Sequence, residues 1–318
     1  MNLALRQHGQ PVSLVVSCLG DGDTGGGLLY YDGQAWIAID DVSTTGLFVS
    51  GDELIRILWA PSQAASGTSI LHYATDGSVR QVAVEGLTDP HDVLWDGQHY
   101  IAVSSINDSI LWITTEGTVV RRFKPARGDD CWHLNSLFIH EHVLHATAFG
   151  RFEVPRGWVE HQRDGTGVLF RLDTGVDVVI GLDCPHTPRF ESGQWIVCNA
   201  SSSDLRVFSA LGELVSRVPL QDWVRGLAIA DEYLLVGESI NRQLTDEVRG
   251  ASVAVLDRKS LTVLARLRLP YREIYDVVLA SPKLLEHVLR APSPRFIVSC
   301  PPQVPSKNSR QSSGHSTS

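Results

Sequence analysis

The sequence predicts an all-β protein, a six-bladed β-propeller with four-stranded blades whose ring is closed by N-terminal strands that join the C-terminal strand. Turn signals such as Asp76-Gly77 and Asp96-Gly97 recur between short β-rich runs. Asp-Gly is a strong hairpin signal because both of its central residues tolerate φ > 0. These turns divide the chain into units of about 40–50 residues, the length of a four-stranded propeller blade.

Each unit opens with an apolar strand, and six such openings fall near residues 45, 91, 133, 186, 225 and 275. Only one strand follows the sixth opening. At the N-terminus, SLVVSC, GLLYYD and AWIAID form three strands that have no opening strand. Joining the two ends therefore completes the sixth blade and leaves only short, protected sheet edges. An open β-sandwich or a pair of smaller barrels is the alternative.

The propeller is expected to occupy residues 1–290 as a single domain, which ends in a short helix that begins at Pro282. Residues 291–318 are rich in Pro and Ser and end in PPQVPSKNSRQSSGHSTS. A segment of this kind lacks the apolar content that offsets the entropy of ordering. We therefore expect the tail to be largely disordered.

Composition and charge argue against several classes of function. The formal charge of -9 and the pI near 5.7 do not provide the basic face that nucleic-acid binding requires. No early stretch has the charge and apolar order of a signal peptide, and no apolar run is long enough to span a bilayer. The five cysteines form no CxxC pair, which fits reduced thiols. We expect a cytoplasmic protein.

Three blade openings carry a histidine just before an apolar strand: His91, His133 and His186. Each histidine lies two residues after an Asp or a Cys. If the three positions are equivalent in the repeat, their side chains converge on one end of the central channel. Three imidazoles suit Fe, Zn, Cu, Mn or Ni, so a divalent transition metal is predicted. The alternative is that the histidines line a wet channel and hydrogen-bond to one another.

Other residues are expected at the same end of the channel. Arg225 and Asp276 occupy the openings of the last two blades, Arg189 follows His186, and Glu238 ends a second strand. Asp276 or Glu238 is the candidate acid or base, while Arg225 and Arg189 are candidates for orienting an anionic substrate. A structural inter-blade ion pair is the alternative for Arg189, and a capping or inter-blade role is the alternative for Glu238.

Two further features accompany the histidines. Asp92 and Asn135 follow His91 and His133 closely and are candidates for fixing an imidazole tautomer. A long irregular connection over residues 149–166 carries charged and aromatic residues. Because connections between second and third strands lie on the same face as the blade openings, this loop is expected to form a pocket wall.

The middle of the chain resembles a known family. Trp132-His133-Leu134-Asn135 and Pro185-His186-Thr187-Pro188-Arg189 are similar to two elements of a bacterial β-propeller family of unknown function, in which Ser is usual at the position of Thr187. The resemblance implies a propeller and important roles for His133 and His186, but no reaction. The architecture is more distantly similar to gluconolactonase, strictosidine-synthase and NHL propellers. The histidine set departs from the channel residues of the first two, so their chemistry is not transferred.

These features predict a small-molecule enzyme in which His91, His133 and His186 hold a metal. The metal would assist lyase or hydrolase chemistry, or an oxidation, on an anionic metabolite. The alternative is a non-catalytic propeller that binds a metabolite or a protein partner. Neither nucleic acid nor a membrane is expected as a partner, and the sequence indicates no oligomeric state.

Overall fold

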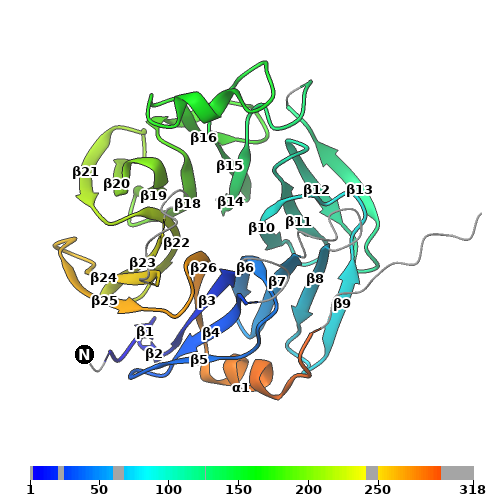
Figure 1. Ribbon diagram of the computed structural model, residues 1–318, viewed down its shortest axis with the longest axis vertical. Coiled ribbons are helices and arrows are strands. Elements are labelled where there is room, and N and C mark those ends of the chain that lie inside the picture. Colours follow the sequence, from blue (N-terminus) through cyan, green and yellow to red (C-terminus); the bar gives the residue numbers. More distant parts are fainter. Residues whose placement is uncertain (1–2, 21–24, 60–67, 126, 241–249, 295–318) are drawn as a thin grey trace, which may run out of the picture.

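The computed structural model describes residues 3–20, 25–59, 68–125, 127–240 and 250–294. Within this part of the chain, six four-stranded antiparallel sheets stand around a central axis (Figure 1). The six-bladed β-propeller predicted from the sequence is therefore confirmed. The expected disorder of residues 291–318 falls mostly outside the described residues.

The first three blades follow one another along the chain. Blade 1 contains β6 (Thr44–Ser50), β7 (Glu53–Trp59), β8 (Thr68–Tyr73) and β9 (Val79–Ala83). Blade 2 contains β10 (Pro90–Trp95), β11 (Tyr100–Ser104), β12 (Ser109–Ile113) and β13 (Val119–Phe123). Blade 3 contains β14 (Leu134–His140), β15 (Val143–Ala148), β16 (Gly167–Arg171) and β17 (Asp177–Leu182).

The last three blades complete the ring. Blade 4 contains β18 (Pro185–Glu191), β19 (Gln194–Asn199), β20 (Asp204–Ser209) and β21 (Leu214–Pro219). Blade 5 contains β22 (Trp223–Ile229), β23 (Tyr233–Ser239), β24 (Ser252–Asp257) and β25 (Val263–Arg268). Blade 6 contains β26 (Glu273–Ala280), β3 (Ser13–Leu19), β4 (Gly27–Tyr31) and β5 (Trp36–Ala38).

Short elements also lie outside the blades. A two-stranded hairpin pairs β1 (Arg6–Gln7) with β2 (Gln10–Pro11). The described 3₁₀ helices are η2 (Gly157–His161) and η3 (Ala200–Ser202), and the α-helix is α1 (Pro282–Arg290). As expected, Pro282 occupies the first turn of α1, where its missing N–H costs no hydrogen bond. No helix in the described ranges has the length and apolar character needed to cross a membrane.

Ring closure joins the two ends of the chain. In blade 6 the C-terminal strand β26 pairs antiparallel with β3, from Glu273 opposite Leu19 to Ala280 opposite Ser13. The N-terminal strands thus supply three strands to the blade that the last strand opens, as the sequence predicted. Closure gives blade 6 the same four strands as the other blades, so that only short sheet edges remain.

The apolar core lies between neighbouring blades. In one cluster, Ile55 and Ile57 of blade 1 pack with Val93 and Tyr100 of blade 2, and all four side chains are fully buried. Alternate residues of each strand face the neighbouring blades on either side, so the central strands read as continuous apolar runs. Burial on both faces fixes the strand register, because a slip by one residue would exchange the two faces.

Polar side chains also tie the inner strands of adjacent blades together. The Leu137 N–H of blade 3 donates to Asp92 Oδ2 of blade 2 at 2.7 Å. The Gly226 N–H of blade 5 donates to Thr187 Oγ1 of blade 4 at 2.9 Å. Each bond satisfies a backbone donor beside a bulge that interrupts the strand ladder. The rigid central ring therefore positions whatever the inner strands carry at their ends.

Candidate active site

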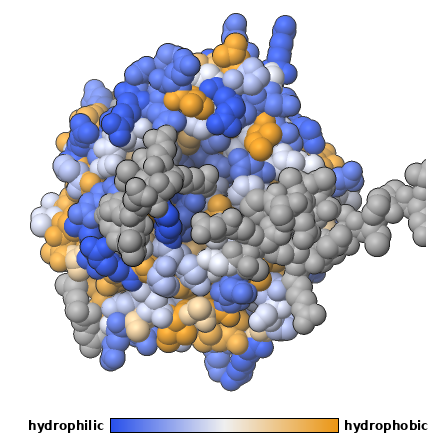
Figure 2. Space-filling view, viewed as in Figure 1, coloured by the Kyte–Doolittle hydropathy of each residue, from blue (hydrophilic) through white to orange (hydrophobic). Residues whose placement is uncertain are grey.

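A pocket of about 910 Å³ opens at the end of the axis where the inner strands begin. The inner strands β6, β10, β14, β18, β22 and β26 contact one another in sequence around the axis and all run in the same direction. Their first residues therefore meet at one end. His91, His133, His186 and Arg225 all line this pocket. Figure 2 shows one face of the molecule, on which hydrophilic residues surround scattered apolar ones.

The three histidines do not occupy equivalent positions in the repeat. Strand pairing starts at Pro90 in β10, at Leu134 in β14 and at Pro185 in β18. His91 and His186 are therefore the second residues of their strands, whereas His133 precedes its strand. The expectation that all three histidines share one register is wrong by two residues for His133. The residue equivalent to His91 in blade 3 is Asn135.

The residue just before the inner strand has a left-handed backbone in four blades. The φ values are 44° for Asp89, 49° for His133, 53° for Cys184 and 57° for Asp222. This region is sterically unfavourable for a residue other than glycine, so surrounding contacts must stabilise the conformation. Asp108 stabilises this backbone conformation at His133. Its carboxylate accepts the N–H groups of the flanking residues, including that of Trp132 at 2.8 Å.

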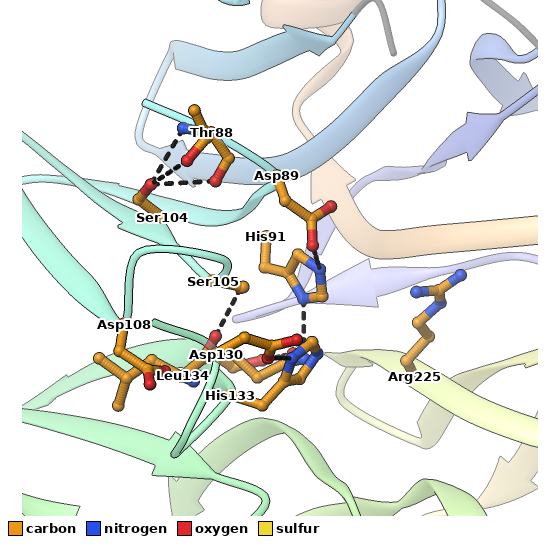
Figure 3. Close-up of polar contacts among 12 residues, drawn as sticks. Thr88, Asp89, His91, Ser104, Ser105, Asp108, Asp130, His133, Leu134 and Arg225 are labelled. Atoms are coloured by element: carbon orange, nitrogen blue, oxygen red, sulfur yellow. Dashed lines mark hydrogen bonds and ion pairs between the residues drawn. The ribbon is translucent and has the colours of Figure 1, made fainter. Parts of the chain in front are cut away.

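His133 is clamped by charge and by aromatic rings. Its Nδ1 and Asp130 Oδ1 are 2.6 Å apart (Figure 3). Trp158 Nε1–H donates to the same Asp130 oxygen at 2.9 Å. The imidazole centroid lies 4.4 Å from that of Phe149 and 4.3 Å from the Trp158 ring. Trp158 belongs to η2, within the long connection expected to form a pocket wall. Nδ1 therefore carries the proton of the neutral ring, and Nε2 carries the lone pair.

His91 uses both of its ring nitrogens. Asn135 Nδ2 lies 2.8 Å from His91 Nδ1, and Asp89 Oδ2 lies 3.4 Å from His91 Nε2 (Figure 3). Burial lowers the pKa of His91, and the nearby Asp89 carboxylate only partly opposes this shift. The neutral ring therefore donates Nε2–H toward Asp89 and accepts from Asn135 at Nδ1. The proposed role of Asn135 in orienting an imidazole thus applies to His91 rather than to His133.

His186 is buried and neutral. Its Nδ1–H donates to the carbonyl oxygen of Cys184 at 2.9 Å, and its ring contacts those of Phe149 and Trp223. Burial, reinforced by the positive charge of Arg225, holds the pKa of His186 well below its usual value. The Nε2 lone pair of His186 is therefore available as an acceptor at neutral pH.

The histidines fit a three-imidazole metal centre only in part. A metal ligand must present a ring lone pair, and His133 and His186 each keep one on Nε2. His91 does not, because Asp89 and Asn135 engage both of its nitrogens. Within the described ranges, no three His, Cys, Asp or Glu side chains come together in an arrangement that could hold a metal ion.

Arg225 is the only predicted catalytic candidate that lines the pocket with the histidines, among the described residues. Its Nε–H donates to the Ile274 carbonyl at 2.7 Å and its Nη2 pairs with Glu273. The guanidinium carbon lies 4.1 Å from the centroid of the Tyr275 ring. Arg225, which the sequence predicts to orient an anionic substrate, is therefore already paired with the carboxylate of Glu273 in the same pocket.

Glu238 lies inside blade 5 and does not line the pocket. Its fully buried carboxylate pairs with Arg266 Nε at 2.9 Å and accepts from Ser252 Oγ at 2.7 Å and from the Gln221 N–H at 2.9 Å. With every lone-pair direction used, Glu238 acts as an internal tie between strands of the blade. This arrangement corresponds to the structural alternative for Glu238.

Asp276 and Arg189 also lie away from the histidine pocket. Asp276 accepts the N–H groups of Val277 at 2.8 Å and of Leu47 at 3.3 Å, so it ties blade 6 to blade 1. Arg189 lines a second cavity at the opposite end of the axis. The structure therefore brings together His91, His133, His186 and Arg225, but not the other three candidates.

Sequence reasoning missed the carboxylate that orients His133. Asp130 lies three residues before His133, inside the turn that precedes the strand, and it contacts both His133 and Trp158. The available signal was the recurrence of an acidic residue just before an opening histidine, since Asp89 stands two residues before His91. Trp158 comes from an insertion, for which the repeat pattern gives no position.

Solved structures share the fold at low identity. A chain of a nidogen/laminin complex is 12% identical with a TM-score of 0.60, and the match covers 85% of this chain and 98% of that one. A luciferin-regenerating enzyme is 10% identical with a TM-score of 0.54, covering 83% of each chain. The calcium-binding protein regucalcin from Agrobacterium tumefaciens is 11% identical with a TM-score of 0.52, covering 76% and 79%. At such identities the likeness concerns the fold alone.

A comparison with curated proteins found no match. A family model, described as a domain of unknown function (DUF4915), matches residues 59–286. The matched region includes the Trp132–Asn135 and Pro185–Arg189 elements on which the sequence resemblance rested. It spans all three pocket histidines together with Asp130 and Trp158. The chain therefore belongs to the DUF4915 family of β-propeller proteins.

Proposed function

We propose that the chain is a small-molecule enzyme and that His133 is its general base. The observation that carries the proposal is the clamp on His133, in which Asp130 and two aromatic rings fix one tautomer of an imidazole that lines a pocket. A base oriented by a carboxylate is the arrangement that general acid–base catalysis uses. Enzymes occur among propellers of the same architecture, such as the luciferin-regenerating enzyme.

The proton path follows from the tautomer. A substrate C–H, O–H or N–H positioned near His133 Nε2 loses its proton to that atom, and the ring becomes a cation. The Asp130 carboxylate, 2.6 Å from Nδ1, stabilises this cation. Phe149 and Trp158, whose centroids lie 5.2 Å from each other, pack against the ring and restrict its rotation. Deprotonation of this kind serves lyases, isomerases and hydrolases equally well.

His91 and His186 support this base in different ways. The His91 ring stands edge-on to that of His133, at 5.2 Å between centroids and 85° between planes. Its bonds to Asp89 and Asn135 make it a rigid, neutral wall. His186 offers a neutral Nε2 that can accept a hydrogen bond from a substrate hydroxyl or amine.

The charged residues that line the pocket limit how many anionic groups a substrate can carry. The described lining includes the guanidinium groups of Arg156, Arg163 and Arg225. It also includes six carboxylates: Asp89, Asp130, Glu160, Asp164, Asp222 and Glu273. A multiply charged anion would meet repulsion from these carboxylates. We propose a substrate with at most one anionic group, which Arg225 orients.

The test is to find a substrate and then to remove the base. Purified protein is incubated with a mixture of small metabolites, and consumption is followed by mass spectrometry. We expect a metabolite that the wild-type protein consumes and that His133→Gln and Asp130→Asn consume at least about 100-fold more slowly, as for loss of a general base. Circular dichroism checks that both variants are folded. Binding without turnover by the wild type would favour the non-catalytic module instead.

Metal chemistry is the second candidate, because His133 and His186 each direct Nδ1 to an oxygen and so keep Nε2 as a potential ligand atom. Elemental analysis of the wild type beside a His91/His133/His186 triple-alanine variant separates the two candidates. The acid–base proposal expects activity that survives exhaustive chelation. Near-stoichiometric Fe, Zn, Cu, Mn or Ni, lost in a folded triple variant together with activity, would overturn it.

A further inference from the structure

A second cavity of about 800 Å³ lies at the other end of the axis, where the inner strands finish. Five of the six inner strands line it with aliphatic residues, for example Leu47, Leu137 and Leu227. The hairpin β1–β2 contributes to the rim through Gln7 and Gln10. A concave, mostly apolar cavity of this volume is within the range of small-molecule sites.

Arg189 is one of two charged residues at a position of the inner strands that is aliphatic in the other four blades. Each inner strand contains a bulge, and the first residue that pairs after it is Leu47 in blade 1, Val93 in blade 2, Leu137 in blade 3 and Leu227 in blade 5. The first residue that pairs after the bulge is Arg189 in blade 4, where the bulge lies one residue further from the strand start than in blades 1–3, and Asp276 in blade 6. The four aliphatic side chains are almost fully buried. The fold thus accepts an aliphatic residue here, and packing does not explain the arginine.

The guanidinium of Arg189 is only lightly engaged. Its one hydrogen bond within the described residues runs from Nη1 to the Pro188 carbonyl at 3.0 Å, and its guanidinium carbon lies 5.9 Å from the centroid of the Phe138 ring. No carboxylate of the described ranges lies within ion-pair distance. A guanidinium has five N–H donors, so most of them remain for a ligand.

The carboxyl groups of Asp92 and Asp276 lie in the same channel but do not accept hydrogen bonds from the Arg189 guanidinium. Asp92 and Asp276 each accept two backbone N–H groups with their own oxygens. Burial raises the pKa of both, and the repulsion from Asp276 adds to the shift of Asp92, whose pKa rises to about 8. The charge of Arg189 lowers the pKa of both carboxyl groups and so opposes this rise, but among the described residues neither carboxyl forms an ion pair with its guanidinium.

We propose that this cavity is a second ligand site, which binds a small molecule with a single carboxylate and an apolar body. The carboxylate pairs with the Arg189 guanidinium through two parallel N–H···O bonds, a geometry that suits this pair of groups. The apolar body lies against the aliphatic residues of the other inner strands. Arg189, which the sequence placed beside the histidines as an anion-binding residue, would therefore bind an anion at the opposite mouth, separately from Arg225.

Calorimetry with octanoate and its uncharged analogue octanamide tests the proposal. We expect the wild-type protein to bind octanoate about tenfold or more tightly than octanamide, as for one charge-assisted pair. Arg189→Leu, which introduces the residue that blades 1, 3 and 5 carry at this position, should bind both compounds equally. Arg163→Gln, a change in the histidine pocket, should keep the preference.

Equal affinity of the wild type for both probes would overturn the proposal, as would an unchanged preference in folded Arg189→Leu or the absence of octanoate binding. If Arg189→Leu does not fold, Arg189→Gln takes its place with the same expectation. A preference lost in Arg163→Gln but kept in Arg189→Leu would place the anion in the histidine pocket instead.

Discussion

The imidazole of His133 shows how a single residue in this protein acquires a defined chemical state. Its left-handed backbone, with φ of 49°, is held by the turn around Asp108, and Asp130 fixes the proton on Nδ1. For His91 and His186, burial lowers the pKa and favours the neutral ring. Residues of one type in one pocket thus have three different sets of partners.

Neutral buried histidines make stability depend on pH. A His186 pKa that is lower in the folded than in the unfolded state means that the unfolded chain binds more protons as the pH falls below about 6.5. His186 therefore loses its stabilising contribution as the solution is acidified. We expect the free-energy difference between wild type and His186→Gln, measured by urea unfolding, to shrink between pH 7 and pH 5.

Exposed His142 provides the matched control for this experiment. The difference between wild type and His142→Gln should stay constant over the same pH range. A His186→Gln difference that remains equally constant would contradict the neutral, buried state described for His186.

At the scale of elements, the inner strands are bound to one another by side chains that replace missing ladder bonds. Thr187 Oγ1 accepts the Gly226 N–H, and the N–H of Thr187 donates to Ser136 Oγ at 2.9 Å. Thr187 also has φ of 44°, which is strained for a β-branched residue. The hydroxyl therefore stabilises the ring, whereas the branch at Cβ does not.

Two substitutions of Thr187 separate these effects. Thr187→Val keeps the branched shape but leaves the buried Gly226 N–H unpaired, which should cost about 1–3 kcal/mol of unfolding free energy. Thr187→Ser keeps the hydroxyl and relieves the strain, so we expect stability equal to or above that of the wild type. Urea unfolding measures both variants. Equal losses for Val and Ser would show that the hydroxyl is not the stabilising group.

Close approach of neighbouring inner strands gives a further prediction. A Cβ on Gly46 would lie 2.6 Å from the Asp92 Cα, which is backbone and cannot move aside. Gly46→Ala should therefore destabilise the protein by at least about 1–3 kcal/mol, the usual cost of overpacking. Gly193→Ala is the control, because a Cβ there meets nothing within 4 Å, although its φ of 77° adds strain. A smaller loss for Gly46→Ala would contradict the packing.

The sequence predicted the elements well and the contacts between side chains less well. The expected openings near residues 45, 91, 133, 186, 225 and 275 lie at or within two residues of the inner strands, because Asp-Gly turns and strand-like runs are local signals. The partners of Arg225 and His91 are Glu273 and Asn135, which come from neighbouring blades. Contacts of this kind depend on blade rotation and on bulges, which no local pattern encodes.

For the whole molecule, stability depends on one pairing between the ends of the chain. The bond from the Asp276 N–H to Ser17 Oγ, at 3.0 Å, spans 259 residues. We expect a truncation after Leu269, which removes β26, to yield insoluble or unfolded protein, while a truncation after Pro294 should stay folded. Soluble expression and circular dichroism compare the two. A cooperative, native-like unfolding transition for the shorter chain would contradict a dependence on ring closure.

The same pairing sets a constraint during synthesis on the ribosome. Strand β3 is synthesised before the strands of blades 1 to 5, whereas its partner β26 is synthesised after them. Until then β3 offers an open edge and buried-type residues such as Val15 and Val16 to solvent, which is the condition that favours aggregation. We therefore expect β3 to β5 to need protection from aggregation until β26 has been synthesised. Chaperones that bind the nascent chain before the ring closes would provide this protection.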